Sequence, residues 1–157
     1  MEFHNIPPLF DENSEILILG SFPSQKSREA EFFYGHSQNR FWLVMSAVLG
    51  EDPPQSIEEK RKMLISHKIA LWDVIKSCEI TGSSDSSIRD VVPNNILGIL
   101  EKSNIKRIFT NGKTAEKYYK KYILETTQIK ATPLPSTSPA NAAYSLERLV
   151  DEWKIIL

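Results

Sequence analysis

The sequence predicts a single α/β domain over residues 1–157, in which a four-stranded, mainly parallel sheet lies between two layers of helices (α/β/α). Two observations predict it. Short apolar segments bounded by turn residues have the pattern of buried strands. Segments with helical periodicity lie between them, and strands that alternate with helices favour a parallel sheet covered on both faces. A chain of 157 residues is long enough for one domain with a full hydrophobic core.

Four segments have the apolar pattern of strands that are buried on both faces. Each one is followed by glycine, proline or short polar residues, which is the chemistry of turns. The predicted strands are Glu15–Leu19, Ile69–Trp72, Lys106–Thr110 and Ile129–Leu134.

Five helices are predicted after these strands or between them. Gly50 follows the first helix as a C-terminal stop. Ser56 and Glu59 form a capping box at the start of the second. Pro93 occupies a permitted first-turn position of the third. The predicted ranges are 41–49, 56–67, 93–103, 112–122 and 141–156.

The composition is that of an ordinary globular protein, with 41 % apolar and 25 % charged residues. No apolar run approaches the length of a membrane span, and the N-terminal Met-Glu-Phe-His is unlike a signal peptide. We therefore expect a cytoplasmic protein without a membrane partner. The single cysteine, Cys78, excludes an intrachain disulfide and any Cys-rich metal site, and we expect it to be buried. No cluster of Cys, His or carboxylate residues has metal-ligand spacing, so we expect no cofactor.

The net charge of −1 gives no global sign of a polyanionic partner. Charge is nevertheless uneven, because the segment from Glu101 to Lys130 holds eight basic and three acidic residues. This segment is either a solvated helix face or a phosphate-binding patch.

Polar and conformationally special residues follow every predicted strand. They are Gly20–Ser24, Asp73, Asn111-Gly112 and Pro135–Asn141. Ligands of parallel sheets bind at the carboxyl ends of the strands, so these residues predict a site at one edge of the sheet. Asp73 also fits a strand-end cap, and Asn111-Gly112 also fits a turn before a helix.

Two segments are the most distinctive in the chain. Gly20–Ser24 reads GSFPS and leads, through a stretch expected to be a long functional loop, to Tyr34–Trp42, which reads YGHSQNRFW. Leu134–Asn141 reads LPSTSPAN. The Ser/Asp-rich stretch Thr81–Asp90 lacks the glycine spacing of an EF-hand or a P-loop, and we expect it to be a mobile connection near the site.

The two distinctive segments resemble motifs of the uracil-DNA glycosylase superfamily, and most of all its hypoxanthine-DNA (deoxyinosine) glycosylase branch. The resemblance implies a monofunctional enzyme that hydrolyses the N-glycosidic bond of deaminated bases, chiefly hypoxanthine, in DNA, and we expect it to act as a monomer. Alternatives are a mismatch-specific uracil/thymine-DNA glycosylase, a non-catalytic nucleic-acid or nucleotide-binding domain, and a hydrolase of free nucleosides.

The resemblance implies that Asn39 is the catalytic residue. A side-chain amide can accept a hydrogen bond from water and also donate one to an oxygen. From the residues alone, Asn39 equally fits the N-cap of the helix that follows it.

Other roles are implied by matching the motifs. Base binding is assigned to Gly20, Ser21, Phe22, Tyr34 and Asn111. Of these, Tyr34 would stack on the base. DNA binding is assigned to Pro23, Ser24, Ser136, Thr137, Ser138, Pro139, Ala140 and Asn141. Ser138 or Asn141 also fits the cap of the last helix.

The chain departs from its relatives in the first motif. Phe22 stands where mismatch-specific uracil glycosylases carry an asparagine, and no aspartate lies between Gly20 and Asn39, where other branches place one. This departure argues against plain uracil activity and shifts the catalytic role to Asn39.

Overall fold

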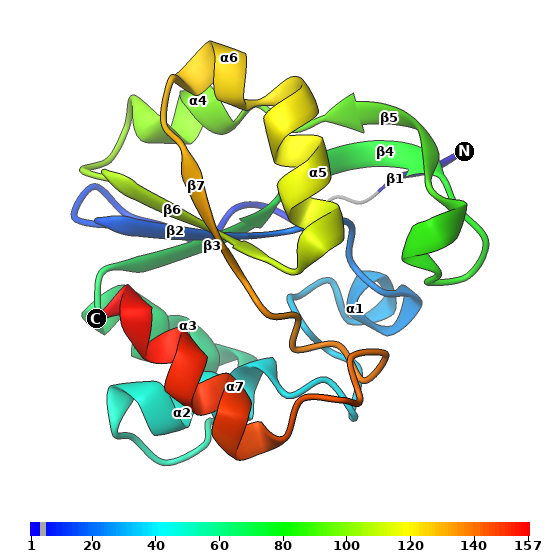
Figure 1. The fold of residues 1–157 in the computed structure, drawn as a ribbon. Helices are drawn as coiled ribbons and strands as arrows, with labels where there is room; N and C mark the ends of the chain where they lie inside the picture. Colours follow the sequence, from blue (N-terminus) through cyan, green and yellow to red (C-terminus); the bar gives the residue numbers. More distant parts are fainter. Residues whose placement is uncertain (4–5) are drawn as a thin grey trace.

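A central sheet of four parallel strands organises the molecule (Figure 1). The computed structural model describes residues 1–3 and 6–157. The strand order is β3-β2-β6-β7, and each pairing is parallel. The strands are β2 (Ile16–Gly20), β3 (Ile69–Asp73), β6 (Arg107–Asn111) and β7 (Ala131–Leu134). All four predicted strands are confirmed, with boundaries moved by one or two residues.

Helices cover both faces of the sheet, which confirms the predicted three layers (Figure 1). One face carries α2 (Phe41–Leu49), α3 (Ile57–Ser66) and α7 (Leu146–Trp153), the last extended by the 3-10 turn η2 (Lys154–Ile156). The other carries α4 (Ile96–Leu100), α5 (Lys113–Tyr122) and α6 (Leu124–Thr127). Within the described residues, no helix combines the length and apolar character needed to cross a membrane.

The predicted Ser56 cap and Gly50 stop are confirmed, whereas the Glu59 side chain accepts from the Ser56 hydroxyl and does not complete a capping box at the Ser56 N–H. The Ser56 hydroxyl accepts the backbone N–H of Glu59 at 3.1 Å and starts α3. Gly50 ends α2 with a φ of 70°, a left-handed conformation that glycine adopts without a steric penalty.

Two predicted helix starts are wrong. Pro93 is the last residue of a strand, and α4 begins after Asn95, whose side chain accepts the N–H of Gly98. The last helix is capped by Ser145, which accepts the N–H of Arg148 at 3.1 Å. Neither Ser138 nor Asn141 caps it, so the second motif lies in a loop several residues before α7.

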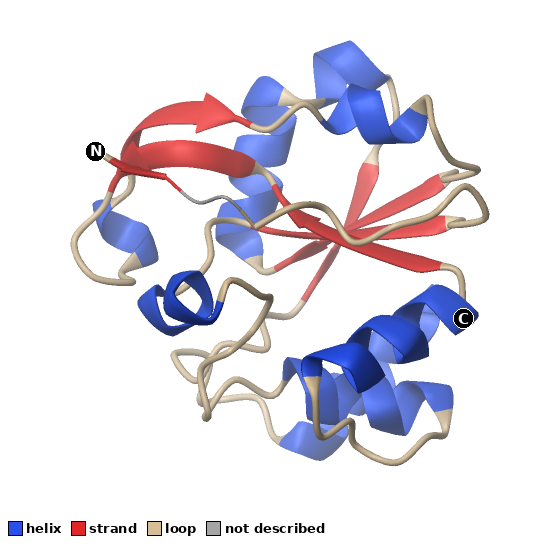
Figure 2. Ribbon diagram, turned by 180° about the vertical axis from the view of Figure 1, so that it is seen from behind, coloured by secondary structure: helices blue, strands red, loops and turns tan. Residues whose placement is uncertain are grey.

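A second, antiparallel sheet was not predicted (Figure 2). Its order is β1-β4-β5, formed by β1 (Glu2–Phe3), β4 (Ile75–Glu79) and β5 (Arg89–Pro93). The β4–β5 connection contains the 3-10 turn η1 (Asp85–Ser87) and makes hydrogen bonds to a short helix, α1 (Gln25–Ala30). The expected long loop after Gly20 therefore contains a helix, and the expected mobile connection is a hydrogen-bonded turn. Cys78 of β4 is buried, as predicted.

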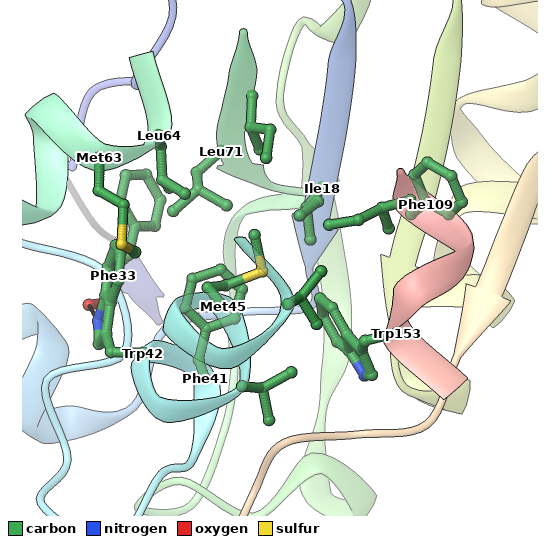
Figure 3. Close-up of a cluster of buried hydrophobic side chains, with 14 of the residues drawn as sticks. Ile18, Phe33, Phe41, Trp42, Met45, Met63, Leu64, Leu71, Phe109 and Trp153 are labelled. Atoms are coloured by element: carbon green, nitrogen blue, oxygen red, sulfur yellow. Dashed lines mark hydrogen bonds between the residues drawn. The ribbon is translucent and has the colours of Figure 1, made fainter. Parts of the chain in front are cut away.

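The larger apolar cluster joins α2, α3 and α7 to the sheet (Figure 3). Phe41 is fully buried and meets the Trp153 ring edge to face, with ring centroids 5.8 Å apart. The indole N–H of Trp153 donates to the carbonyl of Pro135 at 2.9 Å. The last helix is thereby attached to the segment that leaves β7, where the second motif begins.

Replacing Trp153 with alanine should therefore destabilise the fold by about 3–5 kcal/mol, the usual cost of truncating a buried aromatic side chain. Chemical denaturation measures this loss. Ile155→Ala is the matched control, since Ile155 is 55 % exposed and its truncation should change stability by no more than about 0.5 kcal/mol. Equal losses in the two variants would contradict the anchoring role.

Asp73 is a buried carboxylate at the end of β3, with 3 % of its surface exposed. Burial disfavours the charged form and raises the pKa of Asp73 from 3.8 to about 7. Between pH 3.8 and about pH 7, Asp73 is therefore protonated in the folded state and ionised in the unfolded state. The contribution of Asp73 to the free energy of unfolding is therefore most favourable below pH 3.8, and it falls as the pH rises towards about 7.

Asp73→Asn, which cannot ionise, should therefore gain on the order of 1–4 kcal/mol relative to the parent between about pH 5 and about pH 8. Denaturation curves of both proteins across this range provide the measurement. A stability difference that does not change with pH would show that Asp73 stays ionised in the folded protein.

Candidate active site

A cavity of about 520 Å³ lies at the carboxyl ends of the parallel strands, within the size range of small-molecule sites. All the residues that were predicted to bind the base, to bind DNA or to act in catalysis line this cavity, except Asn141. They are Gly20, Ser21, Phe22, Pro23, Ser24, Tyr34, Asn39, Asn111, Ser136, Thr137, Ser138, Pro139 and Ala140. Other predicted residues also line the cavity: Asp73 from the strand ends, His36 from the first motif, and Ser83–Ser86 from the stretch that was expected near the site. Ser27 and Phe33 complete the lining.

The most buried part of the cavity is formed where β2 and β3 end. A Cβ atom at Gly20 would lie 2.6 Å from Oδ1 of Asp73 and 3.1 Å from the Tyr34 hydroxyl oxygen, so only glycine fits. Burial, and then the charge of Asp73, raise the pKa of Tyr34, which keeps the hydroxyl neutral.

Tyr34 has an unusual backbone conformation, with a φ of 53° in a non-glycine residue. Such residues cost about 1 kcal/mol or more and collect at functional sites. Its ring stacks on Phe41, with centroids 4.0 Å apart and planes 17° apart. Because Phe41 covers one face of the ring, only the opposite face is available to a bound base.

Asn39 is held by a chain of hydrogen bonds through Thr137. The Thr137 hydroxyl donates to Oδ1 of Asn39 at 2.9 Å and accepts from Nδ2 of Asn111 at 3.0 Å. The Thr137 backbone N–H donates to Oδ1 of Asn111 at 3.1 Å. Both motifs and the end of β6 are joined at this one fully buried threonine.

The Asn39 oxygen has a second partner, the backbone N–H of Phe41 at 2.9 Å. Asn39 thus supports the start of α2, although Arg40 is the residue at the N-cap position. Two internal donors occupy its carbonyl oxygen, and among the described residues no hydrogen bond engages its Nδ2. The amide therefore offers the cavity a donor, whereas the sequence suggested both a donor and an acceptor.

The second motif is folded by bonds within its own loop. The Ser136 hydroxyl accepts the N–H of Ser138 at 3.1 Å, and the Ser138 hydroxyl accepts the N–H of Ala140 at 3.2 Å. The Asn141 side chain donates to the carbonyl of Ser136 at 3.0 Å. Asn141 supports the loop from outside the cavity.

Arg40 links the first motif to this loop and was not singled out from the sequence. Its guanidinium donates to the carbonyls of Ser138 at 3.5 Å, Asn141 at 3.1 Å and Tyr144. Its backbone N–H donates to the carbonyl of Thr137 at 3.1 Å. Its only sequence signal is its place next to Asn39.

Ser24 has a local structural role besides lining the cavity. Its hydroxyl accepts the N–H of Ser27 and caps α1, and the Ser27 hydroxyl accepts the N–H of Gly35 at 2.8 Å. These two hydrogen bonds join Gly20–Ser24 to Gly35, so the two parts of the first motif are held together through Ser27.

The lysines of the basic segment do not line the cavity. On α5, Lys117 lies over the ring of Tyr118 and Lys121 over that of Tyr122. Lys120 pairs with Glu116 at 3.8 Å. These contacts favour the solvated helix face over the phosphate-binding patch.

Known proteins match the chain along nearly its whole length. The family model of the uracil DNA glycosylase superfamily matches residues 7–156. A protein of Methanosarcina acetivorans named hypoxanthine DNA glycosylase is 37 % identical over 152 residues, covering 96 % of this chain and 94 % of its own. A protein of the same name from Methanosarcina barkeri is 37 % identical over 144 residues, covering 90 % and 89 %.

A solved structure agrees with these matches. It is the solution NMR structure of a Methanosarcina acetivorans protein with a provisional uracil DNA glycosylase name. It superposes with a TM-score of 0.83 at 36 % identity and covers 98 % of this chain and 94 % of its own. The chain belongs to the uracil DNA glycosylase superfamily.

Proposed function

We propose that this protein is a monofunctional DNA glycosylase that removes deaminated bases, chiefly hypoxanthine, from DNA. The observation that carries the proposal is the Asn39 amide. Its oxygen accepts two internal hydrogen bonds, and its nitrogen makes none among the described residues at the cavity. The names of the Methanosarcina relatives support the choice of hypoxanthine.

A glycosylase reaches its target by rotating the nucleotide out of the DNA stack into a pocket. As the bond between C1′ and the base nitrogen breaks, the sugar gains positive charge and the base gains negative charge. A fixed donor that meets the base stabilises that charge without having to reorganise. We assign this role to Nδ2 of Asn39, and we assign stacking on the base to the free face of Tyr34.

Phe22 supports a preference for hypoxanthine over uracil. It lines the cavity with an apolar ring, 8 % exposed, at the position where uracil-directed relatives carry an amide. Without that amide, uracil loses a hydrogen bond that its polar edge would need in a partly buried site.

The cavity also supports monofunctional chemistry. Strand cleavage by a glycosylase needs an amine that forms a Schiff base with the sugar. In the part of the chain that the structure describes, no lysine is among the residues that line the cavity.

Oligonucleotides that each carry one hypoxanthine, uracil, xanthine or ethenoadenine test the substrate directly. Alkali cleavage after incubation reveals abasic sites. We expect rapid release of hypoxanthine, little or no release of uracil, and no strand break before alkali. Comparable single-turnover rates on hypoxanthine and uracil would favour a mismatch-directed uracil/thymine glycosylase, and no release of any base would favour a binding domain.

Asn39→Asp isolates the chemical role of the amide. Aspartate keeps the acceptor for Phe41 and Thr137 but has no N–H to donate, so melting should change little. The single-turnover rate on hypoxanthine should fall by roughly 10²–10³-fold, the usual loss for one preorganised donor. Asn39→Ala should show a similar fall in the single-turnover rate, and its free energy of unfolding should also drop by about 1 kcal/mol.

Gln38→Glu is the matched control, because it makes the same chemical change at the exposed neighbouring position, outside the cavity. It should excise hypoxanthine at close to the parental rate. A stable Asn39→Asp variant with the parental rate would show that Asn39 serves only the helix and the loop.

A further inference from the structure

We propose that Asp85 is a second catalytic residue of this site. Its carboxylate faces the sugar of the extruded nucleotide and takes the proton of the water that adds to C1′. This inference rests on the proposed glycosylase function and goes beyond the roles assigned by the two motifs.

The structure brings Asp85 to the first motif from a distant part of the chain. Asp85 lines the cavity, and the Ser21 hydroxyl donates to its Oδ1 at 3.4 Å across a separation of 64 residues. No acidic residue between Gly20 and Ser27 contributes to the cavity. The β4–β5 connection therefore supplies a carboxylate to a motif that has none at its lining positions.

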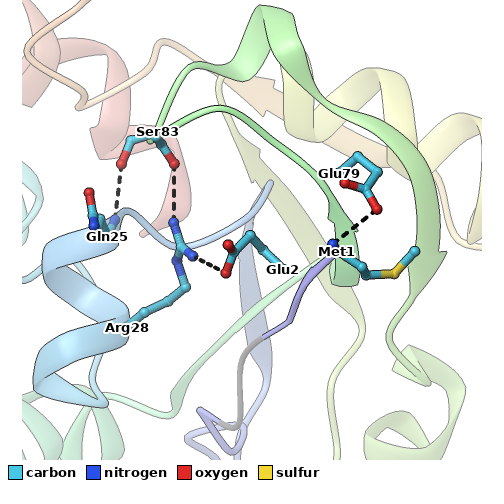
Figure 4. A network of polar contacts seen from close by, with 7 residues as sticks. Met1, Glu2, Gln25, Arg28, Glu79 and Ser83 are labelled. Carbon is cyan, nitrogen blue, oxygen red and sulfur yellow. Dashed lines mark hydrogen bonds and ion pairs between the residues drawn. The ribbon is translucent and has the colours of Figure 1, made fainter.

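The connection is held in place by contacts with α1, which is itself paired with β1 (Figure 4). The backbone N–H of Gln25 donates to the Ser83 hydroxyl at 2.9 Å, and the Arg28 guanidinium donates to the carbonyl of Gly82 at 3.1 Å. Arg28 also pairs with Glu2 at 3.1 Å and lies over the Phe22 ring. These contacts fix the backbone just before Asp85 against the cavity wall.

Two carboxylates line the cavity at different depths. Asp73 is 3 % exposed, whereas Asp85 is exposed to solvent. We infer from this difference that Asp85 lies nearer the opening of the cavity. An extruded nucleotide enters the cavity with its base first, so the sugar comes to lie nearer the opening than the base. Negative charge at that level stabilises the cationic sugar of the transition state, whereas charge near the base would oppose bond breaking.

The surroundings of Asp85 suit a proton acceptor. Partial burial raises the pKa of Asp85, and its interactions with Thr114 and Ser21 offset only part of that rise. A carboxylate with a raised pKa binds a proton more strongly than an aspartate with an ordinary pKa, which suits a proton acceptor.

The reaction step balances with these groups. The bond between C1′ and the base nitrogen breaks, and its electron pair leaves with the base, stabilised by the Asn39 N–H. The water oxygen forms a bond to C1′, and one water proton passes to the Asp85 carboxylate. Asp85 then releases this proton to solvent, and the departed base takes one from solvent.

Asp85→Asn tests the assignment, because asparagine keeps an acceptor for Ser21 but cannot take a proton. The single-turnover rate on an oligonucleotide with hypoxanthine should fall by roughly 10²-fold, the scale of general base catalysis. The melting temperature and the dissociation constant for the same DNA should stay close to those of the parent.

Asp90→Asn is the matched control. Asp90 belongs to β5, does not line the cavity, and has a φ of 55° that asparagine also tolerates. Its variant should retain the parental rate. An Asp85→Asn rate within about twofold of the parent, or an equal loss in Asp90→Asn, would overturn the inference.

The two proposals fail in distinguishable ways. A parent protein that releases no hypoxanthine contradicts the glycosylase function before any variant is made. An active parent whose Asp85→Asn variant keeps its rate contradicts only the role of Asp85. A rate loss that is fully restored by saturating DNA would place Asp85 in binding and would also overturn the catalytic assignment.

Discussion

The geometry of the site depends on the single hydroxyl proton of Thr137. Because that proton goes to Asn39, the Thr137 oxygen can only accept from Asn111, and the direction of the whole chain of bonds is set. The direction then fixes which end of the Asn39 amide is buried. The Thr137 hydroxyl, in a residue with no exposed surface, and the backbone N–H of Phe41 together leave Nδ2 as the unbonded end of the Asn39 amide.

The loop around Thr137 is shaped by the protein itself. The Arg40 guanidinium donates to three carbonyls of the loop, and the Ser136 and Ser138 hydroxyls accept backbone N–H groups of the same loop. Trp153 holds the segment where it leaves β7. Charge-assisted and internal hydrogen bonds of this kind order a loop before any ligand arrives. Such preorganisation lowers the entropic cost of holding an extruded nucleotide.

The two sheets have different roles in the site. The parallel sheet places Gly20, Asp73 and Asn111 at neighbouring strand ends, as expected for an α/β fold. The antiparallel sheet carries the connection that brings Asp85 into the cavity beside Ser21.

The sequence by itself determined the four parallel strands, the limits of α2 and α3, and the candidate residues at the strand ends. These depend on local signals: apolar runs, the Ser56 cap and the Gly50 stop. Only the tertiary structure decided the second sheet, because it pairs residues 2–3, 75–79 and 89–93, and its short strands carry no local pattern. The bond between Thr137 and Asn39 and the approach of Asp85 to Ser21 join residues that lie 98 and 64 positions apart in the chain. Such contacts form only when packing brings distant strand ends together.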